Sequence, residues 1–522
     1  MKKNYPDMKK IRSIFRLLSL FGISALVFSC ASKPTSQTTG WNYNDPDNGG
    51  FEYVDYDEQE TGPGLVFIEG GTFSMGLHEQ DVMYDWNAIP RRVTVSSFYM
   101  DEYEIRNVDY REYLYWLQRV YVDYPEVYQK ALPDTLVWRD KLAYNEPYVL
   151  YYFRHPAYQD YPVVGVNWLQ ANDYAAWRTD RVNELIMVRE GLMYMDPVGQ
   201  TGEENFNTEA YLAGQYEGAV RNQIEDLNPN NDYRRVRMED GIFLPRYRLP
   251  TEAEWEFAAL GLIGNMRAPE RIFDQRIFPW NGHYVRMDGK LDGSPADIGK
   301  IRANFVRGRG DYMGMAGALN DAHDIVAPVY AYWPNDYGLY NMAGNVNEWV
   351  MDVYRQLTSQ DANEFRPFRG NVYKTQVRDE EGAIAEKDSL GHIQWREVTD
   401  EEAFGRYNYR TADNINYLDG DYASSIDYDK EGADKSNKNS DRMYYTGKPG
   451  TDGNWKKGYL GRIDAQSLVT NRARVYKGGG WKDRAYWMQP GARRFLDEEQ
   501  ARDDLGFRCA MHRVGSQIQG TK

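Results

Sequence analysis

Long segments with a regular hydrophobic period are scarce in this chain, and that scarcity limits the folds open to it. Three stretches, residues 107–117, 167–175 and 251–259, combine helical spacing with a capping signal at their start. Most of the remaining sequence is rich in Gly, Pro, Asn and Tyr and alternates only over short lengths. We therefore expect short strands and much irregular backbone, held by aromatic packing and side-chain hydrogen bonds.

The clearest alternation lies in residues 92–100, where Val93, Val95 and Phe98 would share one face of a strand. The sequence before Leu65 is polar, so the globular domain should begin near that residue.

Helix starts are predicted from local capping signals. Asn107 is the expected N-cap of the first helix. Asn167 with Gln170, and Thr251 with Glu254, have the three-residue spacing of a capping box and predict two further helices.

The first thirty residues have the layout of a secretory signal. Six basic residues precede an apolar run from Leu17 to Phe28, which is too short to span a bilayer. The run ends at Ser29-Cys30, a small residue before a lone cysteine, which resembles a lipobox. We expect residues 1–29 to be a lipoprotein signal peptide and Cys30 to be lipidated; the alternative is a simple cleaved signal with an incidental cysteine.

Composition excludes several classes of protein. With 42% hydrophobic residues the chain can bury a large core, and its formal net charge of -16 disfavours a nucleic-acid partner. There are only two cysteines, which excludes a disulfide scaffold. If Cys30 carries a lipid, Cys509 is the one remaining thiol.

The organisation expected along the chain is a single elaborated domain. Residues 30–63 are polar and read as a flexible tether, and residues 64–514 form the domain. Two long polar stretches, about 183–245 and 356–470, lack a sustained apolar period and are interpreted as insertions. Residues 515–522 form a tail.

Six segments, taken in order, resemble the sequence blocks of the formylglycine-generating enzyme (sulfatase-modifying factor) family. The resemblance spans most of the chain and implies an α+β fold of the C-type-lectin-like kind, with little regular secondary structure and two long insertions. The segments are residues 65–76, 98–107, 161–168, 248–256, 338–349 and 506–510.

The same resemblance argues against catalysis. The family's oxygenase chemistry uses two active-site cysteines that hold copper, shortly after a basic-Gly-Gly block that here spans residues 477–481. The cysteine positions fall on Asp483 and Met488, and a soft Cu(I) ion needs paired thiolates. We therefore expect no enzyme activity and no bound copper. Cys509 is expected to be a small buried residue.

The resemblance also implies two structural calcium sites, carried over residue by residue. Hard oxygen ligands from tight loops are those that Ca²⁺ prefers. The alternative is that Asn341 and Glu348 only hydrogen-bond within their own loop. The first site would comprise Asn341, the carbonyls of Gly344 and Val346, and Glu348; the second, more weakly aligned, would comprise Asn304, the carbonyl of Phe305, Asp321 and the carbonyl of His323.

A narrower resemblance, carried by the lipobox, the acidic tether and residues 60–67 and 131–138, is to gliding-motility lipoproteins of Bacteroidota. It implies a palmitate-bearing lipoprotein on the periplasmic face of the outer membrane. Its role would be a scaffold in the gliding and type IX secretion machinery, with other lipoproteins and membrane components of that machinery as partners.

Two other functions stay open. The alternative is a periplasmic or surface lipoprotein that binds a glycan or peptidoglycan, for which 43 Tyr and 14 Trp residues offer stacking surfaces. A residual oxygenase-type enzyme is the third possibility.

Overall fold

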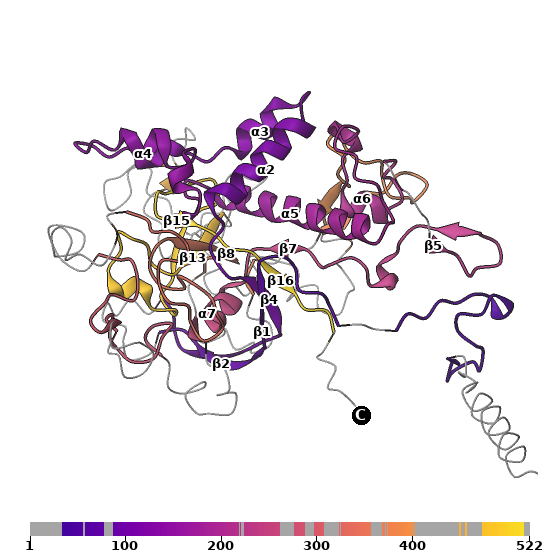
Figure 1. The fold of residues 1–522 in the computed structure, drawn as a ribbon, viewed down its shortest axis with the longest axis horizontal. Coiled ribbons are helices and arrows are strands. Elements are labelled where there is room, and N and C mark those ends of the chain that lie inside the picture. The colour runs from indigo at the N-terminus through magenta and orange to yellow at the C-terminus, as the bar shows by residue number, and fades with distance from the viewer. Residues whose placement is uncertain are drawn as a thin grey trace, which may run out of the picture. The chain divides into compact units, whose positions relative to one another are not determined.

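The structure is a computed structural model. It describes residues 34–55, 58–77, 87–218, 220, 224–261, 276–287, 297–306, 323, 325–355, 368–370, 372, 374–399, 402, 448–449, 455–456 and 472–515 (Figure 1). The expected signal peptide and Cys30 lie outside these residues, as does most of the stretch 403–470. In the described part of the chain, no helix has both the length and the apolar character needed to cross a membrane.

Two compact units are present, and the larger one contains residues 57–221 and 242–522. Its centre consists of two four-stranded sheets, with strand orders β1-β4-β16-β7 and β14-β13-β8-β15. Mixed helix and sheet content is as the sequence predicted. The strands of the first sheet are β1 Leu65–Ile68, β4 Phe98–Asp101, β16 Ala510–His512 and β7 Tyr247–Arg248; those of the second are β14 Arg494–Asp497, β13 Ala473–Lys477, β8 Asn347–Val353 and β15 Leu505–Gly506.

Strands far apart in sequence close the first sheet. Ala510 of β16 pairs with Met100 of β4 on one side and with Arg248 of β7 on the other. All four residues of β4 are buried, because β4 is an inner strand. The first strand of this sheet, β1, begins at Leu65, whereas the larger unit begins at residue 57.

Shorter ladders surround the two sheets. The expected strand at 92–100 is in fact two strands, β3 and β4, which belong to different sheets. Ser97 lies between them and accepts a hydrogen bond from the Gly70 backbone (3.0 Å). The two-stranded pairs are β2 Gly71–Met75 with β3 Arg91–Val95, β5 Ile224–Glu225 with β6 Tyr233–Arg234, β9 Lys374–Gln376 with β10 Trp395–Glu397, and β11 Lys448–Pro449 with β12 Trp455–Lys456.

All three predicted helices are present, and two of their three predicted N-caps are confirmed. Asn167 and Gln170 form a reciprocal capping box at the start of α5, and Thr251 and Glu254 do so at α7. The helices are α2 Asn107–Val120, α3 Pro125–Ala131, α4 Glu146–Tyr151, α5 Trp168–Arg189, α6 Thr208–Leu212 and α7 Glu252–Leu260.

The predicted cap of α2 is wrong by one residue. Arg106 is the N-cap, and its backbone N–H donates to the Asp109 carboxylate (3.2 Å). The Asn107 side chain instead donates to the carbonyls of Tyr152 (3.2 Å) and Tyr158 (2.9 Å). A tertiary contact therefore takes the side chain that local spacing assigned to the cap.

Aromatic packing holds the larger unit together, as the sequence predicted. Tyr110 of α2 stacks on Tyr174 of α5, with ring centroids 5.6 Å apart, and Tyr174 meets Phe507 edge-on at 5.4 Å. A second cluster lies under β2, β3 and α7, where the Phe73 and Phe257 rings are 5.3 Å apart.

The stretch expected to be the first insertion contributes to a core of its own. Its predicted start, residue 183, falls inside α5, which continues to Arg189. Beyond it, Phe206, Tyr211 and Tyr216 are buried, and the rings of Phe206 and Tyr216 lie 5.4 Å apart. Tyr211 belongs to the five-residue helix α6, and Phe206 and Tyr216 lie in the loops on either side of it, so no sustained period marks them.

The smaller unit comprises residues 1–56 and 222–241, of which 34–55 and 224–241 are described. Much of the segment expected to be a tether therefore has a defined fold. The Arg234 guanidinium joins the two pieces, since it contacts the Glu52 carboxylate and also pairs with Asp240 (2.7 Å).

Candidate functional site

A glycine turn after β13 leads to the positions where the family resemblance placed the copper cysteines. Gly478 and Gly479 have φ angles of 103° and 73°, which glycine adopts without steric cost. A Cβ on Gly478 would lie only 3.2 Å from the Trp255 ring. Glycine thus lets the turn approach α7 closely on its way to Asp483.

Asp483 is saturated with protein donors. Arg494 binds both carboxylate oxygens, Nη1 to Oδ1 at 2.8 Å and Nη2 to Oδ2 at 2.6 Å. The Asn347 amide (3.0 Å) and the Gly480 backbone N–H (2.8 Å) also donate to Oδ2. A two-point guanidinium–carboxylate pair of this kind is both strong and directional.

Aromatic rings on two sides hold Arg494 in this pair. Its guanidinium lies 4.5 Å from the Trp487 ring centroid and 4.9 Å from that of Tyr476. Burial alone would raise the pKa of Asp483, but the hydrogen bonds and charge of Arg494 hold it below its usual value. Asp483 is therefore the anion of a fixed ion pair.

Met488, the second position, is fully buried in an apolar cluster. It ends a short 3₁₀ helix, Ala485–Met488, and packs among Phe278, Phe305 and Ala343. Neither position therefore presents a thiolate, and each has a structural role in its own surroundings.

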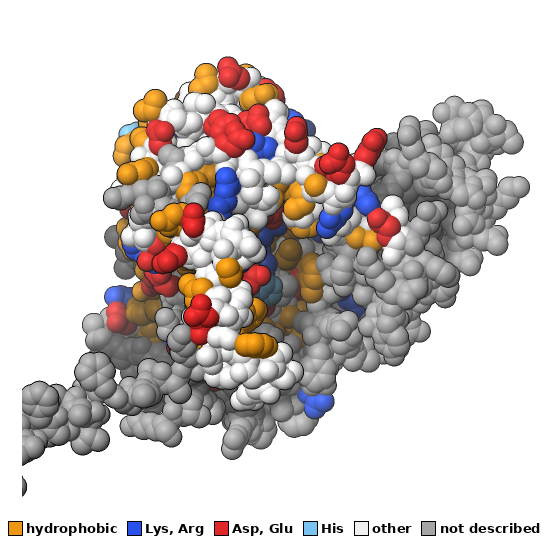
Figure 2. All heavy atoms as spheres, turned by 90° about the vertical axis from the view of Figure 1, so that its right-hand side faces the viewer, with side chains coloured by type: hydrophobic (Ala, Val, Ile, Leu, Met, Phe, Trp, Pro, Cys, Tyr) orange, Lys and Arg blue, Asp and Glu red, His pale blue; other side chains and the backbone are white. Residues whose placement is uncertain are grey.

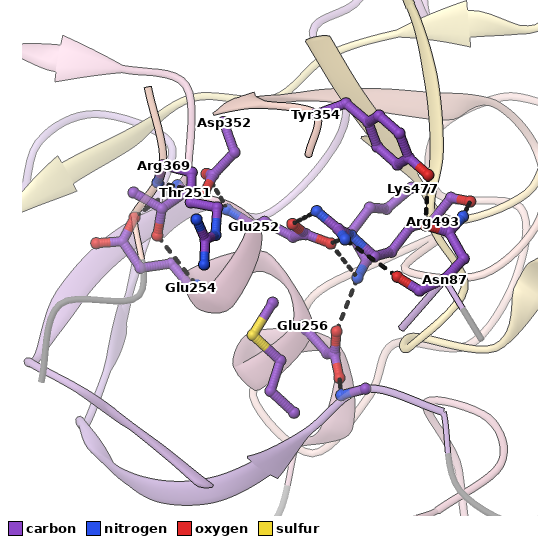
Figure 3. Close-up of polar contacts among 12 residues, drawn as sticks. Asn87, Thr251, Glu252, Glu254, Glu256, Asp352, Tyr354, Arg369, Lys477 and Arg493 are labelled. Atoms are coloured by element: carbon purple, nitrogen blue, oxygen red, sulfur yellow. Dashed lines mark hydrogen bonds and ion pairs between the residues drawn. The ribbon is translucent and has the colours of Figure 1, made fainter. Parts of the chain in front are cut away.

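A buried network of charges lies beside this turn (Figure 3). Lys477 Nζ donates to Glu256 Oε2 (2.7 Å) and Glu252 Oε1 (3.3 Å). Arg493 donates to both oxygens of Glu252, at 2.6 and 2.9 Å. The backbone N–H of Glu252 in turn donates to Asp352 (2.7 Å). Sequence reasoning missed this network, because its members come from α7, β8, β13 and the segment before β14.

The carboxylates of the network have opposite pKa shifts. Burial would raise the pKa of Glu252, but Arg493 and Lys477 lower it to about 2. Burial, together with the charge of Glu252, raises the pKa of Asp352 to about 7. The network therefore keeps Glu252 ionised at neutral pH. Asp352 is the carboxylate whose ionisation is disfavoured by its surroundings.

The structure buries the whole loop of the first expected calcium site, but its side chains have protein partners. Both oxygens of Glu348 accept from Arg508 (2.6 Å each), and Oε2 also accepts from Trp255 Nε1 (2.8 Å). Asn341 donates to Glu104 (3.0 Å) rather than within its own loop. Asn345, which the sequence analysis did not single out, donates to the other Glu104 oxygen (3.0 Å).

Glu104 gives this loop an excess of buried negative charge. Burial, with the charge of Glu348, raises its pKa to about 7, although Arg508 and two asparagine amides oppose the shift. Two buried carboxylates thus share one guanidinium. Asn341 and Asn345 both have positive φ angles (52° and 67°), which asparagine tolerates better than most residues.

The second expected calcium site is only partly within the described residues. Asn304 is buried and donates to the Ile325 carbonyl (2.6 Å), and Phe305 is buried in the apolar cluster around Met488. His323 contacts the Tyr332 hydroxyl at 3.3 Å. Asp321 lies outside the described residues, so these four residues are not brought together here.

Cys509 is a fully buried free cysteine, as expected. Its backbone N–H donates to Asp101 (2.8 Å), next to the start of β16. Burial raises the pKa of its thiol well above the ordinary value, and the charge of Asp101 adds to the shift. A thiol held neutral in this way is a poor nucleophile and a poor metal ligand.

A cavity of about 270 Å³ lies among loops on the larger unit. Its walls include Trp280, Trp333 and Tyr332, with Arg302 and Asp336 as charged lining residues. Asp336 pairs with Arg276 (2.8 Å), and the Trp280 ring is fixed by stacking on Phe278 at 5.1 Å. The cavity therefore offers aromatic faces beside polar groups.

The described surface does not resemble a nucleic-acid interface on the side drawn in Figure 2. There acidic side chains are spread among hydrophobic and basic ones, without a continuous basic patch. Among the described residues, no group of three or more His, Cys, Asp or Glu side chains is arranged to hold a metal ion.

Comparison with known proteins gives the family. A profile of the sulfatase-modifying factor enzyme 1-like domain matches residues 50–395, which includes the loop 341–348 and ends before the turn at 477–488. The chain is 27% identical over 290 residues to the formylglycine-generating enzyme of Mus musculus, covering 55% of this chain and 58% of that protein. It thus spans little more than half the length of the mouse enzyme.

Both active and inactive proteins are among the relatives. Identity is 27% over 299 residues with the formylglycine-generating enzyme of Thermomonospora curvata, covering 56% of this chain and 73% of the enzyme. Identity is 24% over 322 residues with the inactive C-alpha-formylglycine-generating enzyme 2 of Bos taurus, covering 58% and 74%. PvdO from Pseudomonas aeruginosa is a solved structure with a TM-score of 0.37 and 15% identity, covering 86% of this chain and 94% of PvdO.

Proposed function

Because this chain belongs to the sulfatase-modifying factor enzyme 1-like family, we propose that it is a non-catalytic member in which an ion pair replaces the copper cysteines. The observation that carries the proposal is the Asp483–Arg494 pair. The pair uses both carboxylate oxygens and is walled by aromatic rings, so Asp483 is committed to holding the turn after β13. Neither Asp483 nor the buried thioether of Met488 replaces a thiolate for Cu(I).

The finer proposal is a scaffold role at the outer membrane. The sequence resembles the gliding-motility lipoprotein GldJ of Bacteroidota, and on that basis the chain is lipid-anchored through Cys30 on the periplasmic face. It would assemble with other lipoproteins and membrane components of the gliding and type IX secretion machinery. The C-type-lectin-like form of the fold belongs to the same proposal.

Co-isolation from membranes tests the scaffold role. The native, lipidated protein should bring down a defined set of partners of that machinery, and a Cys30→Ala variant should bring down far less of them and incorporate no acyl label. If the Cys30→Ala variant incorporates as much acyl label as the parent protein, Cys30 is not the lipid anchor. If the native protein and the Cys30→Ala variant bring down the same proteins, and none of these belongs to that machinery, the scaffold role is rejected.

The contacts of the second expected insertion, residues 356–470, decide which deletion can test its role in partner binding. Removing all of 356–470 would take away Leu390, whose carbonyl accepts from Tyr121 (3.0 Å) and Asn205 (2.7 Å), and the buried Ile393. A deletion limited to 403–447 leaves these contacts in place. If the insertion carries the partner interface, this shorter deletion should abolish co-isolation while leaving the thermal unfolding of the domain unchanged.

Calcium at the loop 341–348 is part of the proposal on the strength of the family resemblance. Glu104 and Glu348 are both buried beside the Arg508 guanidinium, and Glu348, whose two oxygens accept from Arg508, would have to exchange that pair for the ion. Asn341, Glu348 and the carbonyls of Gly344 and Val346 would hold the ion, which would supply the missing positive charge. A melting temperature that falls on adding a chelator supports this; identical melting with and without chelator contradicts it.

One observation favours a second function, the binding of a glycan. The cavity lined by Trp280 and Trp333 is slightly smaller than pockets for drug-sized ligands, which measure roughly 300–1,000 Å³. Its size and aromatic walls suit about one sugar ring. Calorimetric titration with soluble peptidoglycan fragments should give saturable heat that a Trp333→Ala variant loses, and the absence of heat from the parent protein would reject this function.

A further inference from the structure

The part of the expected tether that the structure describes displays large aromatic side chains to solvent. Trp41 is 62% exposed, Phe51 66% and Tyr53 46%, and Val54 next to them is half exposed. We call these four residues the aromatic patch. A polar linker has no need of such side chains, and exposed apolar groups gathered in one short segment indicate a contact surface.

Hydrogen bonds to the backbone hold the patch in a fixed shape. The Asn44 side chain is bonded to Tyr53 twice, since its Oδ1 accepts from the Tyr53 N–H (2.7 Å) and its Nδ2 donates to the Tyr53 carbonyl (2.8 Å). The Asn44 backbone N–H donates to the Phe51 carbonyl (2.9 Å). The Tyr43 ring lies 5.4 Å from both the Phe51 and Tyr53 rings. The Trp41 carbonyl accepts from the Ser36 N–H (2.8 Å). Little conformational entropy is therefore lost when the patch binds.

The patch is also tied into the smaller unit. Glu52 lies between Phe51 and Tyr53 in sequence and contacts Arg234, which also pairs with Asp240. Glu52 Oε1 in addition accepts from the Leu227 N–H (3.2 Å). The Glu52 side chain is thus held inward, whereas Phe51, Tyr53 and Val54 are exposed.

The position of the patch in the chain points to its partner. Trp41 follows Cys30 by eleven residues, which span at most about 40 Å when fully extended. A lipid on Cys30 would therefore hold the patch next to a bilayer at an effective concentration on the order of millimolar. Trp and Tyr favour the interfacial layer of membranes, where an apolar ring and a polar edge are both accommodated.

We propose that the aromatic patch inserts into the interfacial layer of the membrane that carries the Cys30 lipid, as a second membrane contact beside the anchor. The proposal rests on the proposed function for the nearness of the membrane, but the affinity of the patch for lipid does not depend on the anchor. Stable attachment through lipid chains generally takes two signals, and the patch would supply one of them.

The charge of residues 34–55 predicts how binding should depend on lipid headgroup charge and on salt. Residues 34–55 contain four acidic residues, Asp45, Asp47, Glu52 and Asp55, and no Lys or Arg. This charge disfavours attraction to anionic headgroups, so we expect binding to come from apolar and interfacial contacts. Anionic lipid should weaken binding at low ionic strength, and added salt should restore it.

Vesicle flotation with the unlipidated mature chain, residues 30–522 with Cys30→Ala, tests the proposal. The parent should float with vesicles of zwitterionic phosphatidylcholine and phosphatidylethanolamine. Trp41→Ser should reduce its partition coefficient several-fold, and the Trp41→Ser/Phe51→Ser variant about tenfold or more. The control is Tyr115→Ser, because Tyr115 of α2 is 68% exposed on the other unit and should not contribute.

Three results would overturn the proposal. They are a parent that does not float, equal flotation of the Trp41 and Tyr115 variants, and flotation that rises with the share of anionic phosphatidylglycerol. Loss of partner co-isolation in the Trp41 variant with vesicle binding unchanged would assign the patch to a protein partner instead. Failure of Cys30 acylation is a separate result, because it removes the anchor and leaves flotation by the patch to be measured.

Discussion

Replacing Asp483 by Ala is the sharpest perturbation of the proposed non-catalytic centre. The substitution removes the acceptor for two Arg494 donors, the Asn347 amide and the Gly480 N–H, all at 2.6–3.0 Å. The side chains of Arg494 and Asp483 are only 16% and 10% exposed, so water replaces the lost acceptor poorly. Leaving one member of a buried pair uncompensated costs about 3–5 kcal/mol. Because Arg494 keeps some exposure, we expect about 3 kcal/mol.

A double variant separates the ion pair from simple loss of packing. In Asp483→Ala/Arg494→Met the stranded cation is also removed, and replacing both charges by apolar groups is often nearly neutral. The double variant should therefore recover at least about 1 kcal/mol relative to Asp483→Ala. The free energy of unfolding is measured by urea denaturation of the mature protein, followed by tryptophan fluorescence.

The effect should depend on pH in a defined direction. The pKa of Asp483 is below its usual value in the folded protein, so its contribution to stability is present above pH 4 and is lost as the pH falls through the folded pKa. The difference between parent and Asp483→Ala should shrink in acid. A single variant within about 1 kcal/mol of the parent at pH 7, or a double variant no more stable than the single, would refute the reasoning.

Three further predictions concern other buried groups. Lys477→Met should destabilise the protein by about 3–5 kcal/mol at pH 7, because Glu256 loses the ammonium group that it contacts and Glu252 is left with Arg493. Urea unfolding measures the loss, and a variant within about 1 kcal/mol of the parent would contradict this prediction. Glu348→Gln should lower the melting temperature even in chelator, since Arg508 loses the charge of the carboxylate that binds it at two points, and an unchanged chelator shift in this variant would argue against Glu348 as a calcium ligand. Cys509 should resist alkylation in the folded protein and react fully in denaturant, as mass spectrometry would show; fast reaction in the native state would contradict its burial.

Features set by neighbouring residues were predictable from the sequence. The capping boxes at Asn167 and Thr251 need only three-residue spacing, and both are present. Three of the family blocks contain the starts of the core strands β1, β4 and β8. Asn107 failed as a cap because Tyr152 and Tyr158, more than forty residues away, use its amide.

The polar partners of the site were not predictable. Arg494 and Asp483 are eleven residues apart, without the period of any single element, and Glu104 meets Asn341 across more than two hundred residues. Such pairs form only after strands from distant segments are in register. The smaller unit was missed for the opposite reason, since residues 34–55 have the composition of a linker but are ordered by side-chain contacts such as Glu52 with Arg234.

Copper affinity tests the central claim most directly. The mature protein is titrated with Cu(I) against a colorimetric chelator, under reducing conditions. If the Asp483–Arg494 pair and the buried Met488 have replaced the thiolates, and Cys509 stays neutral in the core, the chelator should keep all of the copper. Tight binding of one copper ion per chain, removed by Cys509→Ser, would contradict the claim and restore an oxygenase function.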